Sequence, residues 1–208
     1  MATLATSRAL IGCYLKINTM LWQHRIGLGG GCHWCTEGVF ASLKGVIQIN
    51  QGWVASVAPN TLFSEAIEVY FEPEIISLHD LLSIHLHTHA CTANHAMLKK
   101  YSSAVYTNSD IQAQQCHKIL QQLQGDFQQE IITQVLPFSE FKANKAELTD
   151  YFYSSPNRPF CQRYIHPKLQ RLMQRFSKHV DKKKLTDAGI NLLNNERINT
   201  KTPRTFEA

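Results

Sequence analysis

A short glycine-rich segment of this 208-residue chain presents a cysteine in a setting that favours nucleophilic chemistry. Gly29-Gly30-Gly31 leads into Cys32, and a helical pattern follows at once. Backbone N–H groups and the positive end of the helix dipole converge at the first turn of a helix, and both lower the pKa of a thiol. Trp34 adds a flat apolar surface beside the sulfur. The segment predicts a reactive thiolate beside an aromatic wall, suited to a small apolar substrate with an electrophilic centre; the plainer alternative is a small buried hydrophobic residue.

Strands and helices alternate in the hydrophobic pattern around this segment. We expect strands at residues 24–28, 46–51, 66–71, 101–106 and 130–135. We expect helices at residues 32–43, 77–85, 109–123, 143–153 and 167–180. Ser77 and Ser109 stand where a hydroxyl can cap the second and third of these helices. Because no internal repeat interrupts the alternation, the pattern favours a single α/β sandwich.

The composition is that of an ordinary globular chain, with 44% hydrophobic residues, 18% charged residues and a net charge of +5. Lys182-Lys183-Lys184 is a basic run, but no aromatic residues interleave with it as they do in nucleic-acid sites. No uninterrupted apolar run reaches the length of a membrane span. The six cysteines are irregularly spaced and no CxxC pair repeats, which disfavours a disulfide framework and a zinc ribbon. We therefore expect neither nucleic acid nor a membrane as a partner.

The two ends of the chain differ in composition from its middle. Residues 1–24 hold no acidic residue and only Arg8 and Lys16 as strong bases, a composition compatible with a degenerate targeting peptide. They lack the successive regions of a secretory signal, so we expect a poorly ordered extension. Residues 181–208 are polar and rich in Asn, and we expect them to form a tail. The folded domain is expected at residues 25–180.

The segment Gly31-Cys32-His33-Trp34-Cys35-Thr36-Glu37 resembles the active-site signature of the methionine sulfoxide reductase A family. That signature usually reads Gly-Cys-Phe-Trp-(Cys or small)-x-Glu, so His33 stands in place of a phenylalanine. Later segments are similar to further motifs of the family, in the same order: Gln51-Gly52-Trp53, residues 64–69, Phe71-Glu72-Pro73, residues 101–106 and residues 155–161. The resemblance covers residues 25–180.

The resemblance implies a fold and an activity. The fold is α+β, a two-layer α/β sandwich in which helices pack against a ferredoxin-like mixed sheet. The activity is thiol-dependent reduction of methionine-S-sulfoxide, free or in proteins, through a cysteine sulfenic acid from which thioredoxin regenerates the enzyme. It requires no cofactor and belongs to protein repair under oxidative stress. On this basis we expect a cytoplasmic monomer.

This chemistry requires a proton donor as well as a nucleophile. Sulfoxide sulfur is electrophilic once its oxygen is protonated or strongly hydrogen-bonded, so Cys32 needs a general acid near that oxygen. Glu65 stands at the position of the family's acid. It lies in an expected strand among apolar residues, where burial would raise its pKa into the range useful for a general acid. Tyr101 could donate its phenol proton to the same oxygen. Without the resemblance, Glu65 reads as an exposed strand carboxylate, and Tyr101 is equally an ordinary strand tyrosine.

Three aromatic residues are expected to line the substrate site. Trp34 would hold the methyl group and the sulfur. Trp53 stands where the family has a tyrosine and offers only an indole N–H as a donor. His33 either packs as an aromatic ring or, if it is protonated, stabilises the thiolate.

A second thiol must condense with the sulfenic acid of Cys32. By the resemblance this thiol is Cys161, in a loop rich in Pro, Asn and Arg that is expected to move. Cys35 is the alternative, because it forms a CxxC pair with Cys32 and such pairs close into disulfides in thioredoxin-like proteins. Cys91 and Cys116 fall in or near predicted helices and are expected to be inert.

Some features favour other functions. The family's loop aspartate is missing near Ala96, which puts full catalytic competence in question. The motif His85-x-His87-x-His89-x-Cys91-x3-His95 is dense in metal ligands, but neither a helix nor a strand would require a metal there, and we expect none. The remaining alternatives are a CxxC thiol–disulfide oxidoreductase and a catalytically weakened relative that binds peptides or a metal.

Overall fold

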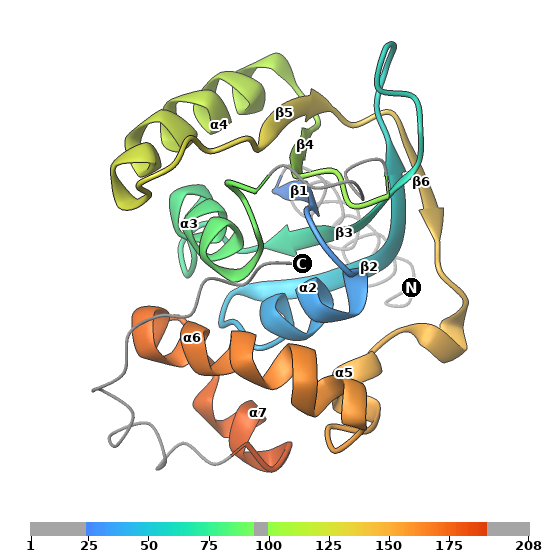
Figure 1. Ribbon diagram of the computed structural model, residues 1–208, viewed down its shortest axis with the longest axis vertical. Helices are drawn as coiled ribbons and strands as arrows, with labels where there is room; N and C mark the ends of the chain where they lie inside the picture. Colours follow the sequence, from blue (N-terminus) through green and yellow to red (C-terminus); the bar gives the residue numbers. More distant parts are fainter. Residues whose placement is uncertain (1–23, 94–99, 191–208) are drawn as a thin grey trace, which may run out of the picture.

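A six-stranded mixed sheet forms the frame of the computed structural model, which describes residues 24–93 and 100–190 (Figure 1). The strand order is β5-β4-β1-β3-β2-β6; β4 and β5 run parallel, and the other neighbouring strands run antiparallel. The strands are β1 (Arg25–Gly29), β2 (Val46–Ala55), β3 (Ser64–Phe71), β4 (Ala104–Thr107), β5 (Gln134–Pro137) and β6 (Glu140–Ala143). The helices are α2 (His33–Phe40), α3 (Leu78–Thr88), α4 (Asp110–Leu123), α5 (Tyr151–Ser154), α6 (His166–Phe176) and α7 (Lys182–Asp187), with short helical turns η1 (Gln124–Asp126), η2 (Ala146–Leu148) and η3 (Cys161–Ile165).

The chain order β1–α2–β2–β3–α3–β4 builds a ferredoxin-like core. Its four strands lie in the order β4-β1-β3-β2, and each neighbouring pair is antiparallel. Helix α4 then carries the chain to β5, which lies parallel beside β4, and β6 pairs with β2 at the opposite edge. The predicted α+β fold with a ferredoxin-like mixed sheet is confirmed.

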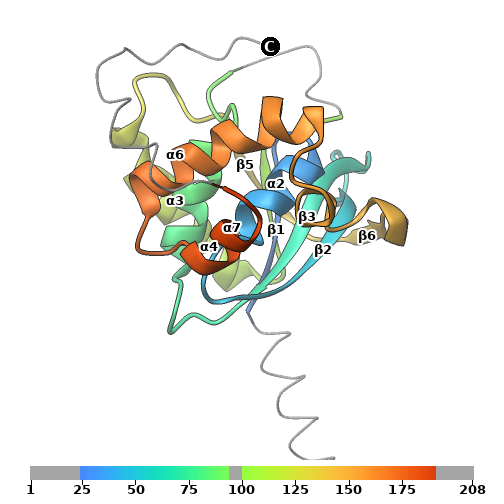
Figure 2. The same ribbon diagram turned by 90° about the horizontal axis from the view of Figure 1, so that it is seen from below.

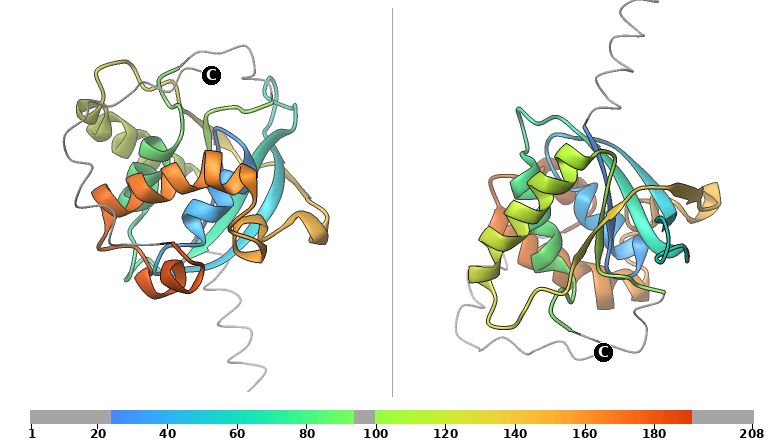
Figure 3. Two further views of the ribbon diagram at one scale, coloured as in Figure 1. Left: turned by 60° about the horizontal axis from the view of Figure 1, so that its bottom comes forward. Right: turned by 90° about the horizontal axis from the view of Figure 1, so that it is seen from above.

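The helices gather on one face of the sheet, as Figure 2 shows. Ile26, Leu28, Ile67 and Val69 project from β1 and β3 into a core that they share with the helices, and all four are fully buried. Removing each such side chain from water contributes roughly 1.5–3 kcal/mol. Helix α6 lies across α2 and α3 and closes this layer (Figure 3). The sheet and the helices on this face therefore form the expected two-layer arrangement.

A smaller cluster of Val54, Ala66, Ala104 and Tyr106 covers the opposite face of the sheet, with partly buried aromatic residues packed against it. Gly52 permits the edge strand β6 to pair closely with β2, because a Cβ at this position would lie 2.1 Å from a main-chain oxygen of β6.

Hydroxyl caps begin two helices where the sequence predicts them. Ser77 Oγ accepts a hydrogen bond from the Asp80 N–H (3.1 Å) at the start of α3. Ser109 Oγ accepts one from the Gln112 N–H (3.2 Å) at the start of α4. Each bond satisfies an amide that has no partner inside its own helix. These two helices are confirmed with nearly the expected bounds.

The expected helix at residues 143–153 is wrong. Strand β6 ends at Ala143, η2 occupies Ala146–Leu148, and α5 begins only at Tyr151. Asp150 has a left-handed backbone with φ of 50°, which interrupts any continuous helix at this point. Other segments also differ from expectation: Tyr101 precedes β4 instead of lying inside a strand, β5 begins at Gln134 instead of residue 130, and α6 ends at Phe176.

The folded part of the chain continues past the expected end at residue 180. Helix α7 lies within the predicted tail, its Leu185 is fully buried, and Lys184 Nζ donates a hydrogen bond to the Ala41 carbonyl (2.7 Å). Residues 182–187 therefore pack on the domain. The predicted extension up to residue 23 and the tail beyond residue 190 lie outside the described residues. No helix in the described part of the chain is long and apolar enough to cross a membrane.

Candidate active site

Cys32 is the N-cap residue of α2 and is partly buried. Its carbonyl accepts hydrogen bonds from the N–H groups of Cys35 (3.0 Å) and Thr36 (3.2 Å), which begins the helix. Hydrogen bonding from the Cys35 thiol, supported by the N–H groups of Cys35 and Trp34, lowers the pKa of the Cys32 thiol, although burial and the charge of Glu65 act against it. The Cys35 thiol and the amides at the helix start thus favour the thiolate form of Cys32.

Glycine and histidine residues hold the loop before Cys32 in place. Gly30 has φ of +143°, and a Cβ there would lie 2.4 Å from the ring of His89, so this position requires glycine. His85 Nε2 donates a hydrogen bond to the Gly29 carbonyl (2.9 Å), and His89 Nδ1 donates one to the His85 carbonyl (2.6 Å). Helix α3 therefore fixes the loop that positions the candidate nucleophile.

The carboxylate of Glu65 lies at the start of α2, although it comes from β3. Glu65 is 7% exposed. Oε2 accepts a hydrogen bond from the N–H of His33 (3.2 Å), the residue that follows Cys32, and Oε1 lies 3.3 Å from Lys100 Nζ. The fold thus brings the predicted nucleophile and the predicted acid to one place.

Further side chains surround this carboxylate. Trp53 is the cross-strand neighbour of Glu65, and the ring centroids of Trp53 and His33 are 5.2 Å apart. Lys100 Nζ, which pairs with Glu65, also lies 4.9 Å from the ring centroid of Tyr101. The structure therefore gathers His33, Trp53 and Tyr101 near the carboxylate, with Lys100 between the acid and the phenol.

Trp34 belongs to a stack of aromatic rings. Its ring lies nearly parallel to that of Tyr151, with centroids 4.2 Å apart, and meets the ring of Phe160 edge-on at 5.5 Å. Trp34 Nε1 donates a hydrogen bond to the Leu148 carbonyl (3.0 Å). The aromatic wall predicted from one residue is thus built from three rings and is oriented by one main-chain carbonyl.

The two candidate resolving thiols lie in different surroundings. Cys35 is 5% exposed, and its hydrogen bond to Cys32, together with burial, holds its pKa well above the ordinary value. Cys161 is fully buried, burial raises its pKa, and its Sγ lies 3.7 Å from the Ser155 carbonyl, to which it donates. The expectation that Cys161 lies in a mobile loop is wrong, because Cys161 begins η3, which continues directly into α6.

Two other thiols are structural. Burial in the main core raises the pKa of Cys91 to about 11 and that of Cys116 to about 12. Thiols in this range stay protonated near neutral pH and are poor nucleophiles. Their surroundings support the expectation that they are inert.

The histidines in and directly after α3 do not converge on one point. The rings of His85 and His89 stack with centroids 4.1 Å apart, whereas His87 packs against aromatic side chains outside α3. Among the described residues, no group of three His, Cys, Asp or Glu side chains is placed to hold a metal ion. Residues 94–99, which include the last histidine of the motif and Ala96, lie outside the described residues.

Sequence reasoning missed several residues of the site. Lys100 directly precedes Tyr101 and could have been noticed as its neighbour. Tyr151 and Phe160 contact Trp34 from a distant part of the chain, and no spacing of residues in the sequence predicts this contact. Lys168 of α6 donates a hydrogen bond to the Thr88 carbonyl and lies close enough to the Cys32–Cys35 pair for their charges to interact. That contact also depends on tertiary packing.

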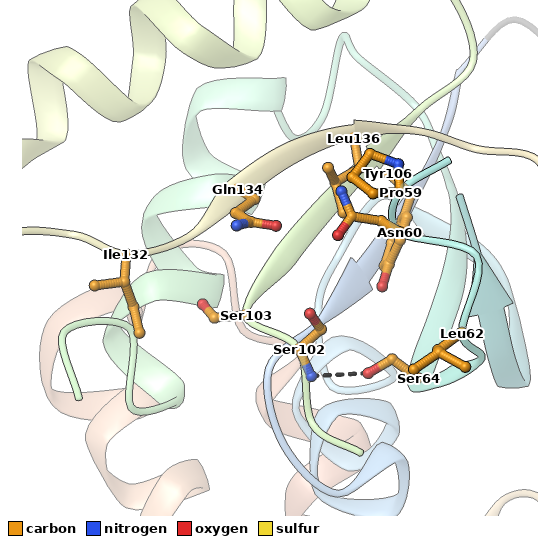
Figure 4. Close-up of a pocket in the computed structure, with 10 residues that line it drawn as sticks. All are labelled: Pro59, Asn60, Leu62, Ser64, Ser102, Ser103, Tyr106, Ile132, Gln134 and Leu136. Atoms are coloured by element: carbon orange, nitrogen blue, oxygen red, sulfur yellow. Dashed lines mark hydrogen bonds between the residues drawn. The ribbon is translucent and has the colours of Figure 1, made fainter. Parts of the chain in front are cut away.

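A separate cavity of about 400 Å³ opens on the face of the sheet that carries the smaller cluster (Figure 4). Hydroxyl, amide and apolar side chains line it, and Ser64 Oγ accepts a hydrogen bond from the Ser102 N–H (2.8 Å) at its edge. Burial raises the pKa of its one phenol, Tyr106, to about 12. This lining contains neither a thiol nor a carboxylate, so it lacks the groups that sulfoxide chemistry needs.

The fold and the thiol site together define the class to which the chain belongs. A family model described as peptide methionine sulfoxide reductase matches residues 24–181. The chain belongs to the peptide methionine sulfoxide reductase family, whose members are oxidoreductases.

Curated relatives agree with this assignment, and a solved structure shares the fold. The peptide methionine sulfoxide reductase MsrA of Psychrobacter sp. (strain PRwf-1) is 32% identical over 171 residues, which cover 74% of this chain and 97% of that protein. An MsrA of Thermus thermophilus is 29% identical over 163 residues, which cover 72% of this chain and 93% of that protein. The crystal structure of Mxr1 from Saccharomyces cerevisiae in reduced form has the same fold, with a TM-score of 0.59 at 21% identity over 67% of this chain and 90% of that one.

Proposed function

We propose that the chain reduces methionine-S-sulfoxide, free or in proteins, to methionine. The observation that carries this proposal is the junction of α2 and β3, where a thiol with a lowered pKa, Cys32, lies close to the buried carboxylate of Glu65. Trp34 supplies an apolar wall next to the thiol. A nucleophile, a proton donor and an apolar surface are what reduction of a methyl sulfoxide requires.

In the proposed first step, the Cys32 thiolate attacks the sulfoxide sulfur while Glu65 delivers a proton to the sulfoxide oxygen. Tyr101 assists at the same oxygen. The oxygen passes to Cys32, which becomes a sulfenic acid, and methionine leaves. The substrate sulfur gains two electrons and the Cys32 sulfur loses two, so this half-reaction needs no cofactor.

In the second step, another thiol condenses with the sulfenic acid, and water leaves as a disulfide forms. The resemblance favours Cys161 as this resolving thiol. The hydrogen bond between Cys35 and Cys32 favours Cys35, so we retain it as the rival. Thioredoxin, which reduces disulfides, is the proposed reductant and protein partner, and protein repair under oxidative stress is the proposed role of the enzyme.

The arrangement also sets the proposed stereospecificity. Trp34, His33 and Trp53 form the substrate-binding surface, with the methyl group against Trp34 and the oxygen directed toward Glu65. A pocket that fixes both substituents of a chiral sulfur accepts one configuration. The S epimer is the one that the family resemblance implies.

One other function has an observation in its favour. A CxxC pair at a helix start, with a thiolate at the first cysteine and a protonated second thiol, is the arrangement of a general thiol–disulfide oxidoreductase. Such an enzyme would reduce insulin disulfides and leave sulfoxides untouched.

Incubation with each epimer of methionine sulfoxide and dithiothreitol, with methionine quantified, tests the proposal. We expect turnover of the S epimer and none of the R epimer. Equal turnover of both epimers, or turnover of neither, would refute the proposal, and insulin reduction without sulfoxide reduction would establish the rival function.

A further inference from the structure

Glu37, the last residue of the active-site signature, takes no part in the proposed chemistry, yet its carboxylate is buried and fully engaged. The residue is 6% exposed. Its Oε1 accepts a hydrogen bond from the N–H of Asp150 (2.8 Å), and its Oε2 accepts from the N–H of Tyr151 (3.1 Å) and from Gln51 Nε2 (2.7 Å). Burial raises the pKa of Glu37, and these bonds act in the opposite direction. The carboxylate thus caps the first amides of α5 from a different helix.

These amides belong to a turn that the chain does not adopt readily. Asp150 has φ of 50°, a left-handed conformation that residues other than glycine rarely take. The next residue, Tyr151, carries the ring that stacks on Trp34. Glu37 therefore bonds directly to the backbone from which the Tyr151 ring projects.

A buried amide side chain, Gln51, and a partly buried one, Asn144, extend this contact to the rest of the site. Gln51 Nε2 also donates to the Leu148 carbonyl (3.3 Å), the same carbonyl that accepts from Trp34 Nε1. Gln51 Oε1 accepts from Asn144 Nδ2 (2.7 Å), and this nitrogen lies 3.4 Å from His33 Nε2. The network therefore reaches both residues that follow Cys32 in the signature.

We propose that Glu37 is a positioning residue for substrate binding: with Gln51 it anchors the turn before α5 and so fixes the Tyr151–Trp34 wall against which the methionine side chain lies. This inference rests on the proposed function. Glu37 has no contact with the reacting atoms, so its role concerns affinity for the substrate and not proton transfer.

The test is Glu37→Gln, which keeps the size of the side chain but turns one acceptor oxygen into an NH2 group that faces an N–H. We expect KM for a methionine-S-sulfoxide peptide to rise roughly tenfold while kcat stays within about twofold, because uniform binding is lost without a change in chemistry. Amide hydrogen exchange should quicken at residues 148–154.

Glu68→Gln is the matched control. Glu68 is also a buried carboxylate, 4% exposed, and it accepts hydrogen bonds from Arg25 Nη1 (2.6 Å) and Asn50 Nδ2 (2.8 Å). It projects from β3 on the opposite side from Glu65, since side chains one or three residues apart on a strand point to opposite faces. We expect this variant to leave KM and exchange at residues 148–154 unchanged.

The outcomes separate this inference from the proposed function. If the unmodified protein reduces neither epimer, the proposed function fails, whatever the variants show. If it reduces the S epimer but Glu37→Gln leaves KM as it is in Glu68→Gln, or lowers kcat at constant KM, the positioning role is refuted. Should Glu37→Gln not fold, Gln51→Met removes the bridging amide alone, and the same rise in KM is expected and decisive.

Discussion

The candidate site has a chemical side, formed by Cys32 and Glu65, and a binding side, formed by the aromatic wall against Trp34. Different kinds of structure build these two sides. Cys32 and Glu65 come from α2 and β3 of the ferredoxin-like core, where strand pairing and apolar packing fix the backbone. The wall against Trp34 comes from residues 144–161, a region of turns and short helices held by hydrogen bonds from side chains to main-chain atoms. The difference predicts that changes on the first side act on the rate, and changes on the second side act on binding.

The largest effect is expected for Cys32→Ser. A serine hydroxyl stays protonated near neutral pH and cannot replace a thiolate, so sulfoxide reduction should fall by more than about 10⁴-fold. Methionine release with dithiothreitol is the measurement. Cys116→Ser, at a buried thiol in the core, is the control and should retain activity; residual turnover by Cys32→Ser at even a few per cent would remove Cys32 from the nucleophile's role.

Glu65→Gln should lower kcat by on the order of 10²–10⁴-fold with little change in KM, because glutamine keeps a hydrogen bond but cannot deliver a proton. Steady-state kinetics on the S epimer measure both constants. Glu68→Gln, which alters a buried carboxylate on the other face of β3, should leave kcat unchanged. Near-native turnover by Glu65→Gln would transfer the acid's role to Tyr101.

Cys161→Ser should still release about one methionine per enzyme and then stall with thioredoxin, because the first step needs only Cys32 and thioredoxin acts on a disulfide. Dithiothreitol should restore turnover by reducing the sulfenic acid directly. Cys35→Ser should keep thioredoxin-driven turnover. Peptide mapping after one equivalent of sulfoxide identifies the bond, and a Cys32–Cys35 disulfide with Cys161 free would make Cys35 the resolving thiol.

Tyr151→Leu should raise KM by about tenfold and change kcat little, since it removes a stacked ring worth about 1 kcal/mol together with its buried area. Tyr153→Leu, two residues along and in contact with Ser42 instead of Trp34, is the control. The same kinetic assay measures both variants. A fall in kcat at constant KM would contradict the division between a chemical side and a binding side.

The smallest expected effect is a gradual fall in the free energy of unfolding at acid pH, caused by the histidines that support the glycine loop. Burial lowers the pKa of His89 to about 4, so the unfolded chain binds this proton more tightly than the folded one. The stability that His89 contributes is full above pH 6.5 and is lost as the pH falls toward 4, by roughly 2 kcal/mol at pH 5. Urea unfolding from about pH 7 to about pH 4.5 measures this loss.

A variant pair separates this effect from general acid denaturation. His89→Gln should flatten the dependence of stability on pH in this range, and His79→Gln, at an exposed position of α3, should leave it unchanged. Equal slopes for both variants would show that His89 does not carry the effect.

The sequence predicts the core well because its signals are local. Ser77 and Ser109 cap helices through their own neighbours, and the glycine run before Cys32 requires a turn into a helix. The motif and its resemblance also bring Cys32 and Glu65 into one site, although they lie on different elements.

The binding wall could not be predicted in this way because its contacts join distant residues. Glu37 caps a turn at Asp150, and no periodicity in residues 143–153 reveals that cap. The apolar residues there suggest a helix, whereas the structure contains a strand end, a short turn and a left-handed residue. Cys161 shows the same limit: Pro and Asn before it suggest a loop, but packing of η3 and α6 on α2 buries it.

The most direct test of the central proposal is a single turnover without reductant. The protein is mixed with one equivalent of methionine-S-sulfoxide, and methionine and free thiols are both counted. We predict one methionine released per chain and loss of the Cys32 thiol, with no methionine from the R epimer. Full retention of the Cys32 thiol after exposure to the S epimer, with no methionine released, would contradict the account.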